Sequence, residues 1–216
     1  AVGYAAAEGN TTGLYNVAVG GSALYTNQDG DNNTAVGYQA LMTFEADTDG
    51  HGGNTAVGAK AMRDATTGEN NTAIGVLALG DGILTGDNNI GIGTNAGMLI
   101  AGGGENVIIG VAAGDALTSG SQNVAIGRGA LGSEDTTGKA VAVGYAALNA
   151  QNASADSYNV AVGYNAGISV STGAKNILVG GLAGDALTTG EYNIAIGHNS
   201  LSAEDTGTRN VAIGFE

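Results

Sequence analysis

The chain has 216 residues, of which 40 are glycine, and it contains no proline, cysteine or tryptophan. Its formal net charge of -14, with only six lysines and arginines, argues against nucleic acid and anionic membranes as partners, because so few cations do not form a basic patch. Without cysteine there is neither a disulfide framework nor thiol chemistry, and no stretch resembles a signal peptide or a transmembrane helix.

A short motif, Asn-x-Ala-Val/Ile-Gly, recurs in degenerate form from end to end. Its closing glycine, called the anchor glycine below, occurs thirteen times: Gly3, Gly20, Gly37, Gly58, Gly75, Gly93, Gly110, Gly127, Gly144, Gly163, Gly180, Gly197 and Gly214. Most of these glycines are 17 residues apart. Such a period is typical of a solenoid, in which each unit buries its apolar face against the next unit. We therefore predict a single repeat array over residues 1–216, and its start within a motif suggests a piece of a longer chain.

Each copy of the motif has the pattern of a short strand. The residue before the anchor glycine is always Val or Ile, and the residue before that is small in most copies, as at Ala18. The residue after the asparagine is also mostly β-branched, as at Val17. This alternation predicts an all-β fold, a parallel β-solenoid (β-roll or β-helix) of about thirteen 17-residue turns.

Two further features of the repeat carry structural predictions. The anchor glycine is expected to end the strand at a corner that excludes a side chain. Three residues later comes Ala or Ser, as at Ala23, and we expect a second short strand there.

An asparagine stands where the chain enters most of the predicted strands. These residues are Asn16, Asn33, Asn54, Asn71, Asn89, Asn106, Asn123, Asn159, Asn176, Asn193 and Asn210. Stacked once per turn, their side-chain amides are predicted to bond to one another in a structural ladder along the axis. Ala140 is the interior exception, and we expect a local defect there.

Along the chain, the longest insertion is a loop at residues 42–53. Its Asp47 and Asp49 could offer carboxylates to a hard cation such as calcium, and the acidic corners at Asp31 and Asp87 pose the same question. A solvated acidic loop is the alternative. We expect no other cofactor. A longer repeat relates residues 89–138 to residues 159–207, which suggests that four units were duplicated together.

Tyrosines recur directly after the anchor glycine, at Tyr4, Tyr38, Tyr145 and Tyr164. They are the candidates for ligand contact, because exposed rings stack on sugars and supply interface anchors. The alternative is that each ring packs against the same position one turn away.

Nothing in the chain predicts an enzyme. The two histidines, His51 and His198, lie in distant turns, and without cysteine they form neither a catalytic triad nor a zinc site. The glycine-rich stretch 102–104 is a connector rather than a phosphate loop, since no Lys-Ser/Thr pair and no helical pattern follow it.

The sequence of residues 33–41, Asn-Thr-Ala-Val-Gly-Tyr-Gln-Ala-Leu, resembles the head repeats of trimeric autotransporter adhesins. With Thr-Gly connectors such as Thr67-Gly68, it is also similar to repeats of bacteriophage tail fibres. The resemblance covers the whole chain. It implies a left-handed parallel β-roll, a homotrimer, and an extracellular place on a cell surface or virion tail. It also implies a host-surface, matrix or glycan receptor.

We therefore expect a non-enzymatic extracellular fibre or adhesin head or shaft that projects from a cell or virion and mediates attachment. The alternatives are a purely structural segment of an extracellular filament and a calcium- or ice-binding solenoid. An ice-binding face would need a regular threonine array, but threonine follows the asparagine only at Thr34, Thr55 and Thr72. We expect no nucleic acid partner and no direct membrane insertion by this segment.

The homotrimer is also expected from the residues themselves. The strands at residues 106–110 and 176–180 are apolar on both faces, and a strand of this kind is normally covered on both. A single chain would expose an apolar stripe along its length, which closed rotational symmetry hides. Ile108 and Leu178 are expected in the tightest-packed layers of that trimer.

Overall fold

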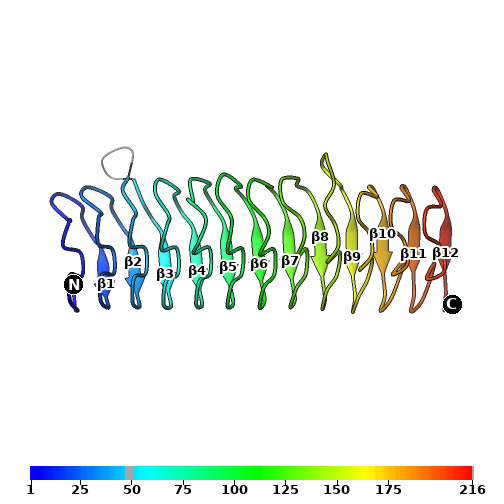
Figure 1. The fold of residues 1–216 in the computed structure, drawn as a ribbon, viewed down its shortest axis with the longest axis horizontal. Helices are drawn as coiled ribbons and strands as arrows, with labels where there is room; N and C mark the ends of the chain where they lie inside the picture. Colours follow the sequence, from blue (N-terminus) through cyan, green and yellow to red (C-terminus); the bar gives the residue numbers. More distant parts are fainter. Residues whose placement is uncertain (47–50, 216) are drawn as a thin grey trace.

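The chain forms a rod of stacked turns in a computed structural model that describes residues 1–46 and 51–215, with the two termini at opposite ends (Figure 1). The described residues contain twelve strands: β1 (Val17–Val19), β2 (Thr34–Val36), β3 (Thr55–Val57), β4 (Thr72–Ile74), β5 (Ile90–Ile92), β6 (Val107–Ile109), β7 (Val124–Ile126), β8 (Val141–Val143), β9 (Val160–Val162), β10 (Ile177–Val179), β11 (Ile194–Ile196) and β12 (Val211–Ile213). The predicted all-β parallel solenoid is confirmed. The count of about thirteen turns is too high, because Val2 of the first copy forms only an isolated bridge to Val19.

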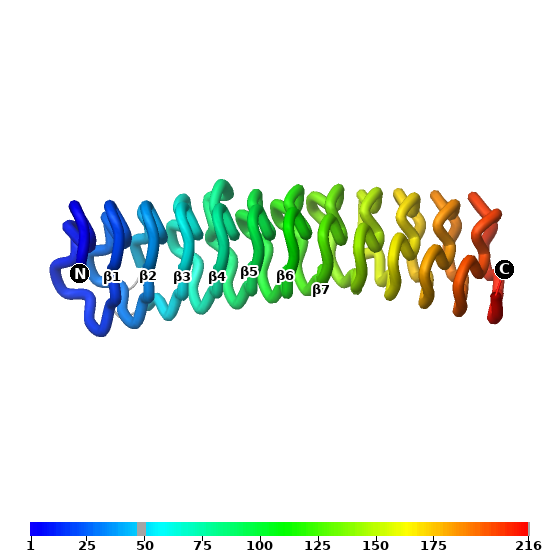
Figure 2. Tube along the Cα trace, turned by 90° about the horizontal axis from the view of Figure 1, so that it is seen from below, coloured from blue at the N-terminus to red at the C-terminus, as the bar shows by residue number. Residues whose placement is uncertain are grey.

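The strands form one parallel sheet in chain order, from β1 to β12. Equivalent positions pair with one another, so that Val17 faces Thr34 and Ala18 faces Ala35. Insertions do not disturb this register, since Thr34 still pairs with Thr55 across the longest loop. Figure 2 shows each turn lying beside the turns before and after it. Every position of the repeat therefore becomes a column of side chains along the axis.

The strands have an inner and an outer face. The middle residue points inward and is buried from β1 to β11, as at Ala35 and Ala125. The first and third residues point outward, and in all twelve strands they are Val, Ile or Thr. The interior is narrow, which explains why the inward residue is small in most turns.

The second predicted strand, beginning near Ala23, is wrong. Residues after the anchor glycine form a turn in which Ser22 and Leu24 have φ of 54° and 51°. Bonds between turns stabilise this segment instead of a strand ladder: Ser22 N–H donates to Tyr4 C=O at 2.8 Å, and Leu24 N–H donates to Ala40 C=O at 3.0 Å. Ala23 and Leu24 are both fully buried, so the segment closes the far wall of the core.

The anchor glycines need to be glycine for two reasons. Gly110 has φ of +137°, a region that side chains rarely adopt. A Cβ on Gly110 would also lie 2.5 Å from the carbonyl oxygen of Gly127, the anchor glycine of the next turn. The predicted corner that excludes a side chain is therefore present. Gly214 has the same kind of φ, +140°, but nothing lies within 4 Å of its Cβ position.

Bulky inward residues are matched by missing side chains elsewhere. Leu178 replaces the usual alanine in β10, and Gly167 and Gly184 stand beside it where neighbouring turns carry leucine. A Cβ on Gly167 would lie 2.6 Å from Leu178 Cδ1, and a Cβ on Gly184 would lie 2.8 Å from Leu178 Cδ2. The interior volume is therefore conserved between the two walls of a turn.

Ile108 is matched by Gly97 and Gly114 in the same way. Ile108 and Leu178 are both fully buried inside the single chain. They therefore do not supply contacts between chains. The argument for a trimer depends instead on the outward residues of the strands.

Candidate functional site

The ladder asparagines form a column inside the rod. Each side-chain oxygen accepts a hydrogen bond from the backbone N–H of the next asparagine, as from Asn71 to Asn54 at 2.9 Å and from Asn89 to Asn71 at 2.8 Å. At most ladder positions the amide nitrogen donates to a carbonyl in the loop of the next turn, as from Asn71 to Gly86 at 2.9 Å. The exceptions are Asn33, whose Nδ2 is buried without a partner among the described residues, and Asn210 in the last turn. Between two described ladder asparagines, a bond from one side-chain amide to the other occurs in the pairs Asn89–Asn106, Asn176–Asn193 and Asn193–Asn210. The column fixes the loop to the strand and is structural.

At Ala140 the column is interrupted, and a buried glutamine takes over part of the role of the missing amide. Ala140 N–H still donates to Asn123 Oδ1 at 3.0 Å, but alanine has no side-chain oxygen for the backbone N–H of Asn159. Asn159 Nδ2 keeps its bond to the Gly173 carbonyl at 2.7 Å and also donates to Oε1 of Gln151 at 2.8 Å. Gln151 is fully buried in the turn that carries the extra residues near 149–156.

Gln151 also contacts a buried carboxylate. Its Nε2 donates to Glu134 Oε2 at 2.8 Å and to Ser157 Oγ at 3.0 Å. Glu134 Oε1 accepts from the Thr137 hydroxyl at 2.5 Å and from the Thr137 backbone N–H at 3.2 Å. Both carboxylate oxygens therefore have partners, and this cluster has a structural role without an open side. The sequence signal for it was the polar Glu134 and Gln151 at a position that is Leu117 and Leu187 in other turns.

The four candidate tyrosines lie in one exposed column at the corner after the anchor glycine. The exposed fractions are 88% for Tyr4, 57% for Tyr38, 46% for Tyr145 and 58% for Tyr164. Tyr145 and Tyr164 stack, with ring centroids 5.3 Å apart and an interplanar angle of 15°. In the same column His198 stacks on Phe215 at 5.5 Å and 14°. The faces of these four rings therefore point along the axis of the rod.

A second column brings cations and rings together, which the sequence reasoning missed. It consists of the residues before the ladder position in the last turns: Lys139, Tyr158, Lys175, Tyr192 and Arg209. Lys175 Nζ lies 4.9 Å from the Tyr192 ring centroid, and the Arg209 guanidinium lies 5.5 Å from it on an adjacent turn. Three of the six lysines and arginines thus share one column, although the sequence predicted no basic patch.

The charges of that column are largely satisfied within the chain. Lys139 Nζ donates to Asp156, and this hydrogen bond raises the pKa of Lys139 and lowers that of Asp156. The hydrogen bond to the Tyr192 hydroxyl, at 2.9 Å, raises the pKa of Lys175. We interpret the column as a set of contacts between turns.

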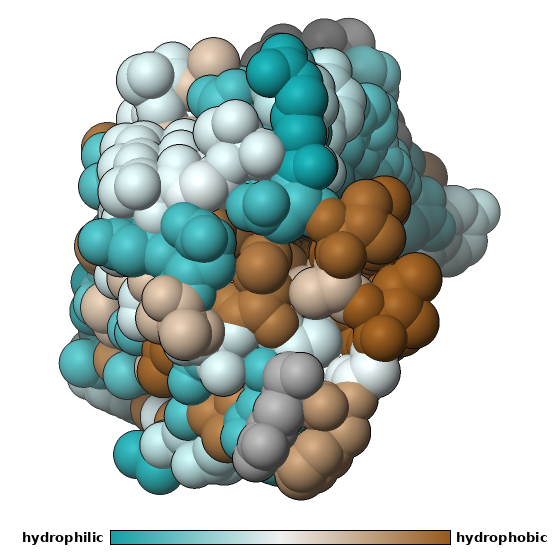
Figure 3. Space-filling model, turned by 90° about the vertical axis from the view of Figure 1, so that its right-hand side faces the viewer, coloured by the Kyte–Doolittle hydropathy of each residue, from teal (hydrophilic) through white to brown (hydrophobic). Residues whose placement is uncertain are grey.

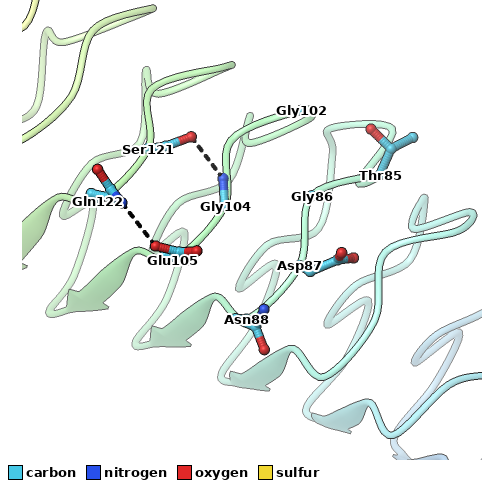
Figure 4. A pocket seen from close by; sticks show the side chains of 9 residues that line it. All are labelled: Thr85, Gly86, Asp87, Asn88, Gly102, Gly104, Glu105, Ser121 and Gln122. Carbon is cyan, nitrogen blue, oxygen red and sulfur yellow. Dashed lines mark hydrogen bonds between the residues drawn. The ribbon is translucent and has the colours of Figure 1, made fainter.

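A surface groove lies along the loops that precede β5, β6 and β7 (Figure 4). It has a volume of about 360 Å³ and polar walls. Gly104 N–H donates to Ser121 Oγ at 3.1 Å, and Gln122 Nε2 donates to Glu105 Oε2 at 3.0 Å. Asp87 Oδ1 accepts from Glu69 N–H at 2.8 Å. Its polar side chains therefore contact one another and the backbone of neighbouring turns.

The described acidic corners and the two histidines contact other residues of the chain. Asp47 and Asp49 lie outside the described residues. At the acidic corner of Asp31, Oδ1 accepts a hydrogen bond from Leu14 N–H at 2.6 Å. His51 Nδ1 lies 2.5 Å from Glu69 Oε1, and His198 belongs to the ring column. Within residues 1–46 and 51–215, no group of three or more His, Asp or Glu side chains is placed to hold a metal ion.

No family model, no curated protein and no solved structure matches this chain. Among the described residues there is no helix that is long and apolar enough to cross a membrane.

Proposed function

We propose that this chain is a non-enzymatic attachment fibre segment that works outside the cell or on a virion tail. Three copies associate through their sheet faces, in the left-handed trimeric arrangement implied by the resemblance to adhesin heads. The assembly acts as a rigid head or shaft that presents its loops and corners to a host-surface, matrix or glycan receptor.

The observation that carries this proposal is the outward face of the sheet. Its Val, Ile and Thr side chains form a continuous stripe over all twelve strands, and in the isolated chain they are partly exposed, with Val17 at 46% and Ile177 at 41%. Seen from the C-terminal end, apolar side chains gather on one side of the rod (Figure 3). An apolar stripe of this length favours burial against another surface.

A second copy is the occupant that suits this stripe. A neighbouring copy presents β-branched columns with the same repeat along the axis, so two faces match over their whole length. Closed symmetry covers all the stripes without leaving a surface for further growth. The net charge of -14 on each chain opposes association elsewhere on the surface, where the acidic loops lie.

The first test is the molar mass in solution. A lysine at Val162, which points outward from β9, is expected to dissociate the assembly while leaving the interior of the chain unchanged. Light scattering should give three times 20.9 kDa for the parent chain and a smaller mass for Val162→Lys. Ser154→Lys, at an exposed loop position, is the matched control. A folded parent monomer would rule out the trimer.

The second test is attachment itself. The purified trimer is presented to whole cells, to immobilised extracellular matrix and to a glycan array, with the dissociated Val162→Lys variant beside it. We expect saturable binding of the trimer to at least one of these surfaces, and weaker binding of the variant because multivalency is lost. Binding to none of the three would exclude the attachment function.

The second candidate function is a purely structural filament segment. One observation favours it: the polar side chains of the loop groove in Figure 4 are engaged with neighbouring turns, including the Ser121 and Gln122 contacts. In that case the trimer forms and the Val162→Lys variant dissociates, but neither binds any surface in the attachment assay.

A further inference from the structure

The corner column contains two places where a side chain is missing. The residue after the anchor glycine carries a side chain in every turn except two, where it is Gly21 and Gly181. Each of these glycines lies between two ring residues: Gly21 between Tyr4 and Tyr38, and Gly181 between Tyr164 and His198. The same arrangement therefore occurs twice in one column, near opposite ends of the rod.

Neither glycine is required by the backbone or by packing. Gly21 and Gly181 have no left-handed φ, unlike the anchor glycines. A Cβ on Gly21 would lie 3.5 Å from Cδ2 of Tyr38, and a Cβ on Gly181 would lie 3.5 Å from Cδ2 of His198. Both distances are ordinary van der Waals contacts. A side chain is therefore sterically allowed at both positions, and its absence leaves ring faces uncovered.

The spacing of the turns sets the width of these gaps. Rings in adjacent turns of this column stack directly, at 5.3 Å for Tyr145–Tyr164. Across Gly181 the flanking rings belong to turns two apart, which corresponds to roughly 10 Å at a strand spacing of ~4.8 Å. One further ring inserted midway would stand about 5 Å from each neighbour. Consistent with an open face, Tyr164 is 58% exposed and Tyr145 46%, although the two stack on each other.

We infer that each gap binds one uncharged sugar ring, held between Tyr4 and Tyr38 above Gly21 and between Tyr164 and His198 above Gly181. A pyranose presents C–H bonds on its two faces, which suits two aromatic faces, and its hydroxyl groups point sideways. A polar residue follows the flanking ring or glycine at both gaps: Ser22 and Gln39 at the first, Asn165 and Asn199 at the second. Ser22, Gln39 and Asn199 offer hydrogen-bond donors and acceptors near the gaps, whereas the side-chain oxygen of Asn165 is buried.

The charge of the chain selects among sugars. With a net charge of -14, the rod repels carboxylated and sulfated glycans. The two gaps are nine turns apart, roughly 43 Å at ~4.8 Å per turn, so a trimer presents six well-separated sites. Weak binding at each site then adds up to strong attachment to a dense glycan surface. The inference rests on the proposed attachment function, because the sugar sites specify the chemistry of the surface to which the fibre would attach.

The sugar sites are tested by placing a tyrosine ring in each gap. In the double variant Gly21→Tyr, Gly181→Tyr the new rings continue the stack and occupy the space of the sugar. Binding to an array of neutral oligosaccharides, including cellobiose and lactose, is expected to fall by about tenfold or more. Val111→Tyr adds a ring to the same column between Thr94 and Arg128, away from either gap, and is the matched control; it should bind as the parent does. Melting of all variants by circular dichroism checks that they fold.

The outcomes separate this inference from the attachment function. If the parent attaches to cells and the filled variant attaches equally well, the sugar sites are wrong and attachment stands. If the parent binds no neutral sugar on the array but attaches to matrix protein, the same conclusion holds. If the folded double variant loses both sugar binding and cell attachment while Val111→Tyr keeps both, the sites are established. Preference for sulfated or carboxylated glycans would overturn the assignment of an uncharged sugar.

Discussion

At the scale of single residues, the fold depends on backbone conformations that side chains rarely adopt. In each turn the anchor glycine and three other positions have positive φ, and many of these are not glycine, such as Gln39, Lys60 and Leu79. These residues tolerate left-handed geometry because inter-turn hydrogen bonds on both sides define it. The anchor glycine differs, since it also lacks space for a Cβ. The sequence predicted the glycine corner because glycine occurs there in every turn. The residue types of Gln39 and Leu79 do not indicate a positive φ. The segment after the anchor glycine was therefore wrongly predicted to be a second strand.

The first prediction concerns this corner. Gly110→Val should destabilise the chain by more than about 2 kcal/mol, because both the φ of +137° and the contact with Gly127 oppose a side chain. Gly214→Val is the comparison, since it shares the φ but has nothing within 4 Å. Denaturant melting should place Gly214→Val much closer to the parent. Equal effects of the two variants would show that backbone strain alone, without the neighbouring turn, makes glycine necessary.

A second prediction tests the exchange of volume between the two walls. Leu178→Ala should cost about 2–5 kcal/mol through the cavity it leaves, and Gly167→Leu about 1–3 kcal/mol through overpacking. The backbone permits the leucine, because φ is +58° at Gly167 and 49° at Leu148, its equivalent one turn earlier. The double variant should cost less than the sum by at least about 1 kcal/mol, as measured by chemical denaturation. Additive losses would show that the two side chains do not share one space.

At the scale of the turn, the strand and its asparagine act as one element. Their positions were predictable from the sequence because strand and column positions repeat the same residue types. The partners of the asparagines were not predictable, since the acceptor of Asn71 Nδ2 is a loop carbonyl at Gly86, and nothing in either residue type indicates this contact. Likewise, Ala140 predicted a defect, but the replacement by Gln151 depends on how the extra residues of that turn fold inward. Of the candidate site, the sequence located the ring column through Tyr145 and Tyr164, but not which ring faces are covered.

The third prediction concerns that replacement. Gln151→Leu removes a donor from Glu134 and an acceptor from Asn159, and should cost about 1–3 kcal/mol by denaturant unfolding. Adding Glu134→Leu should recover part of the loss, because leucine fills the equivalent place at Leu117 and an apolar pair leaves no unpaired buried carboxylate. If the stability losses of the Gln151→Leu and Glu134→Leu single variants simply add in the double variant, the buried carboxylate of Glu134 does not depend on Gln151 for its stabilisation.

At the scale of the whole molecule, the structure is a one-dimensional array in which each turn contacts its neighbours. Eleven strand-to-strand steps at ~4.8 Å place β12 roughly 53 Å from β1. Small-angle scattering of the protein should therefore give an elongated particle, with a cross-section set by the proposed trimer. A compact globular profile would contradict both the rod and the proposed fibre.

A fourth prediction also belongs to the whole rod. EDTA should shift the melting temperature only slightly, because the acidic corners at Asp31 and Asp87 already accept backbone hydrogen bonds from neighbouring turns. Thermal melting with and without the chelator, followed by back-titration with calcium, gives the comparison. A large, calcium-reversible loss of stability would assign a metal to the carboxylates of the loop at Asp47 and Asp49.

The parallel pairing of successive turns has a mechanical consequence. Its hydrogen bonds, such as Val17 N–H to Asn33 C=O, point along the axis of the rod. A force that pulls the two ends apart therefore acts first on the hydrogen bonds of the outermost turn. That turn detaches while the inner turns stay paired. Each 17-residue turn that detaches releases roughly 55–60 Å of chain, so a chain that is held at both ends lengthens in steps of about this size under load.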